Sequence, residues 1–380
     1  MSREPRICLF DWNVGGHHAE NAKAFAAAIA PGAEVVMAAP ERTLEAIGDP
    51  SLSTVPLGEG RPRPETSGAD KAELAEAELD VIEEVVASVR PDQLVLLWAD
   101  PVLRWLLARP PLPTEVSMFV AFAPLHYHRA YGVPRGVGGT ARAVFKELSV
   151  LRWAQRKDAR AIFALDSMAA RRWSRYPGAD VHPVGEAPLS YLPDRQPPEL
   201  RRGCMLFGYL DERKGIGRIA DAVSRDCEGL LLRLWGESAP GYEATLAAEI
   251  ERMRSAGVEV DARLERVPYE EALDTMAASS AALLSFGWVS PGSRVLLEAA
   301  AAGTPAIGSI RGAAGYLIAK HDLGAAVDPS DTAGLRAAIR ELGLGSAGAE
   351  RLSGPLRKYA EAHDREHYGR EIRGALGLDS

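Results

Sequence analysis

The stretch Ser285-Phe-Gly-Trp-Val-Ser-Pro-Gly-Ser-Arg-Val-Leu-Leu-Glu-Ala-Ala-Ala-Ala-Gly-Thr-Pro-Ala-Ile-Gly-Ser-Ile310 decides the fold prediction. It begins in a strand predicted over 281–286, passes through a Pro/Gly turn and continues as a helix that is capped by Ser293 and ends at Gly303. A second apolar strand is predicted over 306–310. Strand, helix and strand in this order form a parallel crossover unit, in which ligands bind where the turn enters the helix.

Glu298 is the exceptional residue of this predicted helix. It lies among Ala and Leu residues about one turn past the helix N-terminus, where a buried carboxylate without a partner would be costly. Two interpretations stay open on the residues alone. The helix is either an Ala-rich crossover helix with one partly exposed Glu, or a helix that presents a carboxylate to a ligand.

The same stretch resembles the donor-site signature of the retaining glycosyltransferases of family 4, which have the GT-B fold. In that family a Glu-X7-Glu motif leads into Ala-X-Ala/Cys-Gly-Thr-Pro. Glu298 matches the second Glu and residues 302–305 match the end of the motif, but Ser290 stands in place of the first Glu. The resemblance implies that Glu298 binds the ribose hydroxyls of a nucleotide-sugar and that the turn with Ser290, Gly292 and Ser293 belongs to the donor site.

The composition favours a soluble two-domain protein. A chain of 380 residues is long enough for two domains with separate cores. The net charge of −8 argues against a dedicated nucleic-acid binder. The three cysteines are far apart and lack metal-ligand spacing, which argues against a disulfide framework or a zinc site. With no cleavable apolar segment before the first strand and no run near roughly 18 apolar residues, we expect a cytoplasmic protein.

A glycine pair follows the first predicted strand, 7–11. Gly15 and Gly16 lie between this strand and a predicted helix, where glycine lets backbone N–H groups approach a phosphate or a sugar. Family 4 enzymes have a Gly-Gly loop after their first strand, and the resemblance places Gly15 and Gly16 there. His17 and His18 come next, either as ligand contacts or as a surface His pair.

Two histidines follow the strand predicted over 116–122. His126 and His128 come just past its carboxyl end, the edge at which α/β enzymes bind ligands. One exposed His and one backbone-bonded His would fit the pattern as well. Family 4 members commonly have a His near the reacting sugar at this point, which implies this role for His126 first and for His128 second.

A helix predicted over 140–160 carries an excess of basic residues. Its apolar stripe and its basic side chains are typical either of a solvated face or of peripheral contact with an anionic membrane. The basic residues are Arg142, Lys146, Arg152, Arg156, Lys157 and Arg160, against the acidic Glu147 and Asp158.

The segment 208–215 resembles the family's Gly-Arg-Leu-X3-Lys-Gly element, whose Arg and Lys bind the donor diphosphate. Gly208 and Lys214 match the element, but Tyr209 replaces its Arg. A leaving diphosphate accumulates negative charge, which cations or N–H dipoles must stabilise in a metal-free site. We therefore expect a second cation to assist Lys214, unless Lys214 is only an exposed turn residue. The candidates are Arg294, and as alternatives Arg213 and Arg311.

Two further positions match the family's C-terminal domain. Gly236 ends a strand predicted over 229–235, like the family's strand-Gly element. Arg263 lies in a predicted strand, 258–264, that resembles the strand beside the nucleobase pocket. Proline is frequent over 176–203, which is typical of a linker.

The alternation of strands and helices predicts two doubly wound, Rossmann-like domains that face each other across a cleft, the GT-B fold. The predicted parts are an N-terminal acceptor-side domain (1–195), a C-terminal nucleotide-sugar donor domain (196–350), and a helical tail (351–380) that packs back on the N-terminal domain.

The resemblance implies a transferase that moves a sugar from a nucleotide-diphosphate sugar to a hydroxyl or amine acceptor with retention. It implies no cofactor and no metal, and it suits a front-face mechanism in which the leaving phosphate helps to deprotonate the acceptor. The alternatives are a sugar-nucleotide epimerase or phosphorylase of the same fold, and a non-catalytic nucleotide-binding relative. Ser290 and Tyr209 favour the last alternative, or else an atypical donor sugar such as a deoxy or amino sugar in natural-product or glycan biosynthesis.

Overall fold

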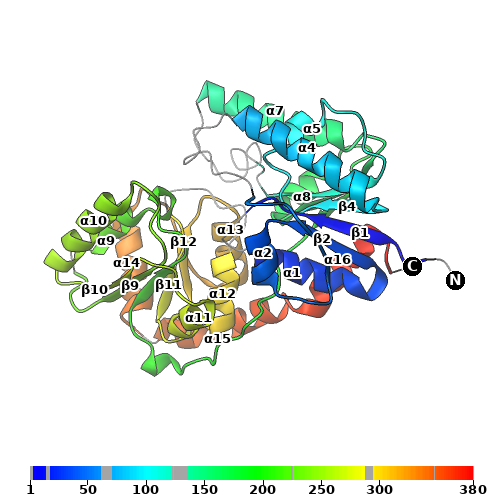
Figure 1. The fold of residues 1–380 in the computed structure, drawn as a ribbon. Coiled ribbons are helices and arrows are strands. Elements are labelled where there is room, and N and C mark those ends of the chain that lie inside the picture. Colours follow the sequence, from blue (N-terminus) through cyan, green and yellow to red (C-terminus); the bar gives the residue numbers. More distant parts are fainter. Residues whose placement is uncertain are drawn as a thin grey trace. The chain divides into compact units, whose positions relative to one another are not determined.

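The protein forms two compact units in the computed structural model (Figure 1). The structure describes residues 3–13, 18–60, 71–121, 123, 136–223, 226–286, 294–345 and 347–379. The N-terminal unit holds the described residues up to 123, those of 136–188 and those of 364–379, and the C-terminal unit holds those of 189–363.

The N-terminal unit is built on a parallel sheet of seven strands in the order β3-β2-β1-β4-β5-β6-β7. The strands are β1 (Arg6–Phe10), β2 (Glu34–Ala39), β3 (Ser53–Pro56), β4 (Gln93–Leu96), β5 (Glu115–Val120), β6 (Ala159–Ala164) and β7 (Val181–Pro183). The strand order reverses between β1 and β4, which makes the carboxyl ends of these two strands the switch point of the sheet.

Helices cover both faces of this sheet, which explains its continuous apolar strands. They are α1 (His18–Ile29), α2 (Glu41–Ile47), α4 (Lys71–Val89), α5 (Leu103–Leu106), α7 (Val137–Trp153), α8 (Ser167–Trp173) and α16 (Arg365–Leu376), with a 3-10 turn, η1 (Ala30–Gly32). Helices α1, α2 and α16 pack on one face, where Leu9, Phe25 and Ile372 share one core. Helices α4, α5 and α7 lie together on the opposite face (Figure 1).

The C-terminal unit repeats the same topology. Its parallel sheet of six strands has the order β10-β9-β8-β11-β12-β13, with the switch point between β8 and β11. The strands are β8 (Cys204–Phe207), β9 (Leu231–Trp235), β10 (Glu259–Arg263), β11 (Ala281–Leu283), β12 (Ala306–Ser309) and β13 (Gly324–Val327).

Successive side chains of the central strands point to opposite faces of this sheet. Met205 and Ala282 face α11 and α12, whereas Leu206 and Leu283 belong to the larger core. The helices are α9 (Ile216–Val223), α10 (Glu243–Ser255), α11 (Tyr269–Ala277), α12 (Arg294–Ala302), α13 (Ala313–His321), α14 (Thr332–Gly343) and α15 (Ala347–Glu361), with the 3-10 turns η2 (Pro198–Leu200) and η3 (Glu212–Lys214). None of the helices that the structure describes is long and apolar enough to cross a bilayer.

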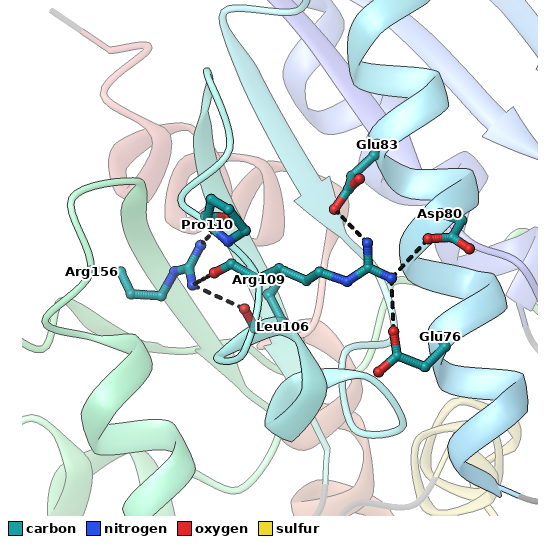
Figure 2. Close-up of polar contacts among 7 residues, drawn as sticks. All are labelled: Glu76, Asp80, Glu83, Leu106, Arg109, Pro110 and Arg156. Atoms are coloured by element: carbon teal, nitrogen blue, oxygen red, sulfur yellow. Dashed lines mark hydrogen bonds and ion pairs between the residues drawn. The ribbon is translucent and has the colours of Figure 1, made fainter.

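The predicted helix over 140–160 is wrong at both ends, because α7 spans Val137–Trp153 and Arg160 lies in β6. The chain turns away where Arg156 pairs with Asp158 and donates to three backbone carbonyls, those of Leu106, Arg109 and Pro110. Figure 2 shows the bonds from Arg156 to the three carbonyls, beside the ion pairs of Arg109 with three carboxylates of α4. Arg156 therefore holds a loop in place and does not extend a basic helix face.

The proline-rich segment 176–203, predicted as a linker, also contains a β-strand. Val181–Pro183 forms β7, which pairs with β6. The division between the units falls between Pro188 and Leu189, since Leu189 is packed in the C-terminal core and Ala187 in the N-terminal one. The helical tail is two helices, because Asp364 caps the N-terminus of α16 by accepting a hydrogen bond from the backbone N of His367.

Candidate functional site

Glu298 is the centre of a buried polar cluster on α12. Its side chain has no exposed surface, and its Oε1 accepts a hydrogen bond from the Tyr269 hydroxyl at 2.9 Å. The Nε of Arg294, which is 5% exposed, lies 3.5 Å from the same oxygen. The other carboxylate oxygen, Oε2, is buried and has no hydrogen-bond partner among the described residues. The partly exposed Glu that the sequence left open is therefore excluded.

Burial and the neighbouring groups act in opposite directions on the protonation of the Glu298 carboxyl, and burial is the larger influence. Burial raises the pKa of the Glu298 carboxyl, while Arg294, the Tyr269 hydroxyl and the Lys214 ammonium act in the opposite direction. Burial and the Glu298 charge in turn raise the pKa of Tyr269, so this hydroxyl stays protonated and able to donate. The arrangement leaves Oε2 as an acceptor for hydroxyl groups of a ligand.

Lys214 lies in the turn after β8, beside this cluster. Its Nζ donates to the carbonyl oxygen of Phe207 at 2.7 Å. Burial lowers the pKa of Lys214 to about 8, although the charges of Asp211 and Glu298 act to raise it. The backbone carbonyl of Lys214 accepts from the N–H of Phe286, which explains why β11 is shorter than the predicted strand 281–286. This bond ties together the chain segments that follow β8 and β11, the two strands of the switch point.

Two glycines allow the backbone to approach closely at this point. Gly208 has φ +105° and Gly236 has φ +139°, conformations that favour glycine. A Cβ on Gly236 would lie 2.0 Å from the carbonyl oxygen of Gly208, and a Cβ on Gly208 would lie 3.3 Å from Nζ of Lys214. The turns after β8 and β9 are thus packed backbone against backbone.

The Gly303-Thr304-Pro305 end of α12 has a structural role that the sequence did not indicate. The Thr304 hydroxyl donates to the Met276 carbonyl of α11 at 2.7 Å. Arg195 donates to the Ala301 carbonyl at 2.9 Å, and Arg201 donates to the Gly303 carbonyl. Two cations at the C-terminus of α12 complement its dipole and fix the helix that carries Glu298.

The other basic candidates are engaged with carboxylates. Arg213 pairs with Asp211, and Arg311 pairs with Asp328 at 3.1 Å. The Arg263 guanidinium lies 4.0 Å from the centroid of the Trp235 ring and pairs with Glu271. These last three residues line a shallow cavity of about 670 Å³ between β9, β10 and α11, which contains neither Lys214 nor Glu298.

A second polar cluster lies at the switch point of the N-terminal sheet. Asp11 follows β1, is 2% exposed, and its Oδ2 lies 2.6 Å from Nδ1 of His18 at the start of α1. Its Oδ1 accepts from the backbone N and the side-chain Nδ2 of Asn13. The His18 ring meets the Trp98 ring edge to face, with centroids 5.5 Å apart. His18 is therefore a half-buried side chain that is paired with Asp11.

Several predicted site residues lie outside the part of the chain that the structure describes. They are Gly15, Gly16, His17, His126, His128, Ser290, Gly292 and Ser293. Among the described candidates, Lys214, Arg294 and Glu298 come together, and Gly208 and Gly236 join them through the turn after β8. Tyr209 follows Gly208 in the same turn.

Two residues of these clusters were missed from the sequence. Tyr269 lies 29 positions before Glu298, in a segment whose resemblance points to the nucleobase pocket and not to Glu298. Asp11 is predicted only as the last residue of a strand. Its signal was available, because an acidic residue directly after the first apolar strand of an α/β sheet lies at the ligand-binding edge.

Comparisons with known proteins identify the fold. No family model and no curated protein matches the sequence. Solved structures match over nearly the whole chain, among them sucrose-phosphate synthase from Thermosynechococcus elongatus, which is 16% identical with a TM-score of 0.68 and an alignment covering 99% of this chain and 98% of that one. The chain has the GT-B fold. The predicted fold class is therefore confirmed.

Two further structures with this GT-B fold are similar to the chain. WaaG, a glycosyltransferase involved in lipopolysaccharide biosynthesis, is 16% identical with a TM-score of 0.63, over 98% of this chain and 99% of that one. HepE from Anabaena, in complex with UDP-glucose, is 14% identical with a TM-score of 0.66, over 98% and 99%. Within the described residues of this GT-B chain, no three His, Cys, Asp or Glu side chains gather as ligands for a metal ion.

Proposed function

We propose that the protein is a glycosyltransferase that moves a sugar from a nucleoside-diphosphate sugar to a hydroxyl or amine acceptor with retention of the anomeric configuration. The observation that carries the proposal is the buried Glu298 carboxylate, whose Oε2 has no partner among the described residues, next to the Lys214 ammonium at the switch point of a GT-B sheet. A carboxylate acceptor and a cation at one edge of a sheet fit the two ends of a ribose diphosphate.

Each residue then has a chemical role. Glu298 accepts hydrogen bonds from the ribose hydroxyls, and Tyr269 and Arg294 hold it in place. Lys214 stabilises the negative charge that develops on the leaving diphosphate, and the backbone at Gly208 allows a phosphate to approach. We also propose that Arg294 adds to the positive potential at the diphosphate.

The proposal extends to residues outside the described part of the chain. Gly15, Gly16 and His126 would contact the sugar and the acceptor, and Ser290, Gly292 and Ser293 would form the turn around the donor sugar. Because Ser290 is shorter than Glu and uncharged, a deoxy or amino sugar remains the proposed donor. Faster turnover of ordinary UDP-glucose than of such sugars would contradict this part.

Thermal unfolding in the presence of nucleotides tests the donor site. UDP, GDP and ADP and their sugars are compared, because HepE holds UDP-glucose and the base preferred by this chain is unassigned. A ligand at 100 times its dissociation constant should stabilise the protein by about 2.7 kcal/mol. If no nucleotide raises the melting temperature, the proposed function fails.

Stereochemistry is tested without knowledge of the acceptor. When the enzyme hydrolyses UDP-glucose with water as the acceptor, proton NMR identifies the glucose anomer that is released first. Retention gives α-glucose first. If β-glucose is released first, glycosyl transfer remains supported but retention of the anomeric configuration is contradicted. Interconversion of the nucleotide-sugar without release of UDP would favour the epimerase alternative.

We further propose that α7 makes peripheral contact with an anionic membrane. Large apolar side chains are exposed along this helix, including Val137 at 91%, Phe145 at 54% and Leu148 at 48%. Arg142 and Arg152 are exposed on the same helix, whereas Glu147 is buried and paired with Arg172. Sedimentation with phosphatidylglycerol vesicles, and its loss in Phe145→Ser, would support the contact. Equal binding to phosphatidylcholine vesicles would contradict the role of charge.

A further inference from the structure

We infer that Tyr269 limits Glu298 to a single ribose hydroxyl, so that the donor site recognises a nucleoside diphosphate through one of its ribose hydroxyls and tolerates loss of the other. The inference rests on the proposed function and narrows its ribose contact. The observation behind it is the unequal surroundings of the Glu298 oxygens. Oε1 accepts from the Tyr269 hydroxyl at 2.9 Å, and the buried Oε2 has no partner among the described residues.

The two partners of Oε1 come from different helices. The Tyr269 hydroxyl belongs to the first residue of α11. Nε of Arg294, one turn before Glu298 on α12, lies 3.5 Å from the same oxygen. Each oxygen of an ionised carboxylate has about two acceptor sites, and here a hydroxyl and a guanidinium face both of them. Oε1 therefore has no acceptor site left for a ligand.

The hydrogen of the Tyr269 hydroxyl points to Glu298. Burial and the Glu298 charge raise the pKa of this hydroxyl, whereas the charge of Arg294 and a hydrogen bond from it act to lower that pKa. A guanidinium only donates, so the Tyr269 oxygen accepts from Arg294 and keeps its own hydrogen for Oε1. The three side chains thus form one chain of hydrogen bonds that ends at Oε1.

The packing of α11 and α12 holds the two carboxylate oxygens in separate roles. Glu298 has no exposed surface, and rotation of its carboxylate would break the hydrogen bond from Tyr269. A hydrogen bond to a charged acceptor is stronger than one between neutral groups, so this rotation is costly. The helices are also joined at the other end of α11, where the Thr304 hydroxyl donates to the Met276 carbonyl at 2.7 Å.

A purely structural cluster would leave Oε2 unexplained. A buried acceptor without a partner destabilises a protein, and native structures keep few of them. Lys214 acts on Glu298 through its charge, but its Nζ donates to the Phe207 carbonyl at 2.7 Å. A ribose hydroxyl that donates to Oε2 completes the cluster. Two neighbouring hydroxyls would need both oxygens of the carboxylate to bind side by side, and Tyr269 occupies one of these oxygens.

Calorimetry with UDP and its two monodeoxy forms, each of which lacks one of the ribose hydroxyls, tests the inference. In the wild type, the form without the bound hydroxyl should have a dissociation constant about 10-fold higher or more, because a hydrogen bond to a charged acceptor is lost. The other form should bind as UDP does. If GDP or ADP gives the larger thermal shift, the same comparison is made with its monodeoxy forms.

Tyr269→Phe tests the role of the hydroxyl. Phe keeps the ring and releases Oε1, so the monodeoxy form that the wild type tolerates should now bind about 10-fold more weakly than UDP. Tyr191→Phe is the matched control, since the Tyr191 hydroxyl donates to Asp274 of the same helix at 2.7 Å, and it should keep the wild-type pattern. Each ratio compares ligands on one variant, so it does not depend on how stable that variant is.

The outcomes separate this inference from the proposed function. If both monodeoxy forms bind the wild type more weakly than UDP, both hydroxyls are held and the inference is overturned. It is also overturned if neither form binds more weakly, because Oε2 then does not contact the ribose, or if Tyr269→Phe keeps the wild-type pattern. A wild-type protein that binds no nucleoside diphosphate contradicts the proposed function instead.

Discussion

The two sheets share one strand order, but the side chains at their switch points differ in kind. At the β8/β11 switch point, the charges of Lys214 and Glu298 lie close enough to shift each other's pKa; Glu298 is buried and Lys214 is half-buried. At the β1/β4 switch point, an imidazole and a carboxylate form a short contact, and no lysine or arginine contacts this pair among the described residues.

The difference indicates a division of chemical work between two copies of one topology. A half-buried cation and a buried acceptor oxygen without a partner among the described residues suit a ligand that is polar and anionic, such as a ribose diphosphate. An oriented imidazole suits the movement of a proton. Changes at the C-terminal switch point should therefore alter nucleotide binding or departure of the diphosphate, and changes at His18 should leave nucleotide binding intact.

The largest effect is expected for Lys214→Ala. Loss of the cation at the leaving diphosphate should lower kcat for UDP release by about 100- to 1,000-fold. Lys320→Ala is the control, because that ammonium lies over the Tyr316 ring on α13 and should leave kcat unchanged. If Lys214→Ala turns over at the wild-type rate, the two switch points do not differ in the way proposed.

A smaller loss is expected for Glu298→Ala. Charge-assisted hydrogen bonds to the ribose contribute about 1.5 to 3 kcal/mol each, so the dissociation constant for UDP should rise by at least about 12-fold. Glu298→Gln, which keeps the side-chain volume beside Arg294, separates lost binding from lost packing. Glu249→Ala on α10 removes a more exposed carboxylate paired with Arg252 and is the control for binding by calorimetry. Unchanged UDP affinity in both Glu298 variants would refute the ribose contact.

A stability effect is expected for Gly236→Ala. The new Cβ would lie 2.0 Å from the Gly208 carbonyl oxygen at a left-handed φ, so the free energy of unfolding should fall by about 1 to 3 kcal/mol and UDP binding should weaken. Gly241 also has a positive φ, +81°, but open space where the Cβ of Gly241→Ala would lie, so this variant measures the cost of a side chain at positive φ without a clash. Equal urea midpoints for the two variants would show that the close approach does not matter.

The smallest effect concerns pH. Because burial lowers the pKa of Lys214 to about 8, the ammonium is present below this pH and lost as pH rises through it. In the wild type, kcat for UDP release should therefore fall by about tenfold per unit above this pH, whereas Lys214→Arg stays protonated and its rate should not fall there. A wild-type profile that stays level up to pH 10 would show that this lysine does not act as the cation.

Most of the fold follows from local sequence. The apolar run 92–98 predicts a strand, observed as β4 (Gln93–Leu96), and helical spacing over Lys71–Val89 predicts α4. The edge strands β3 and β7 are not predicted from the sequence, because they are short, contain proline and have few buried side chains. Their strand conformation depends more on pairing with a neighbouring strand than on their own composition. The tail appeared continuous because helical periodicity runs through Asp364, whose capping role depends on its backbone conformation.

The candidate site, like the fold, is predictable from the sequence only in part. Glu298 and Lys214 are recognisable because each lies in a motif of adjacent residues. The contacts Tyr269–Glu298 and Asp11–His18 depend on how strands and helices bring separate segments together, and no spacing in the sequence encodes them. The sequence left the surroundings of His18 open for this reason, since its partner Asp11 is a buried carboxylate at the end of β1.

Helix α16 has a consequence for the synthesis of the protein. Its residues Tyr368, Ile372 and Leu376 belong to the core that α1 and β1 also form, the Leu376 carbonyl accepts from Gln93, and Arg373 donates to the Ala28 carbonyl of α1. A growing chain usually completes its first domain before the second emerges from the ribosome. Here the N-terminal core cannot close until residues 365–376 have been translated, so the C-terminal unit has all its core segments available first.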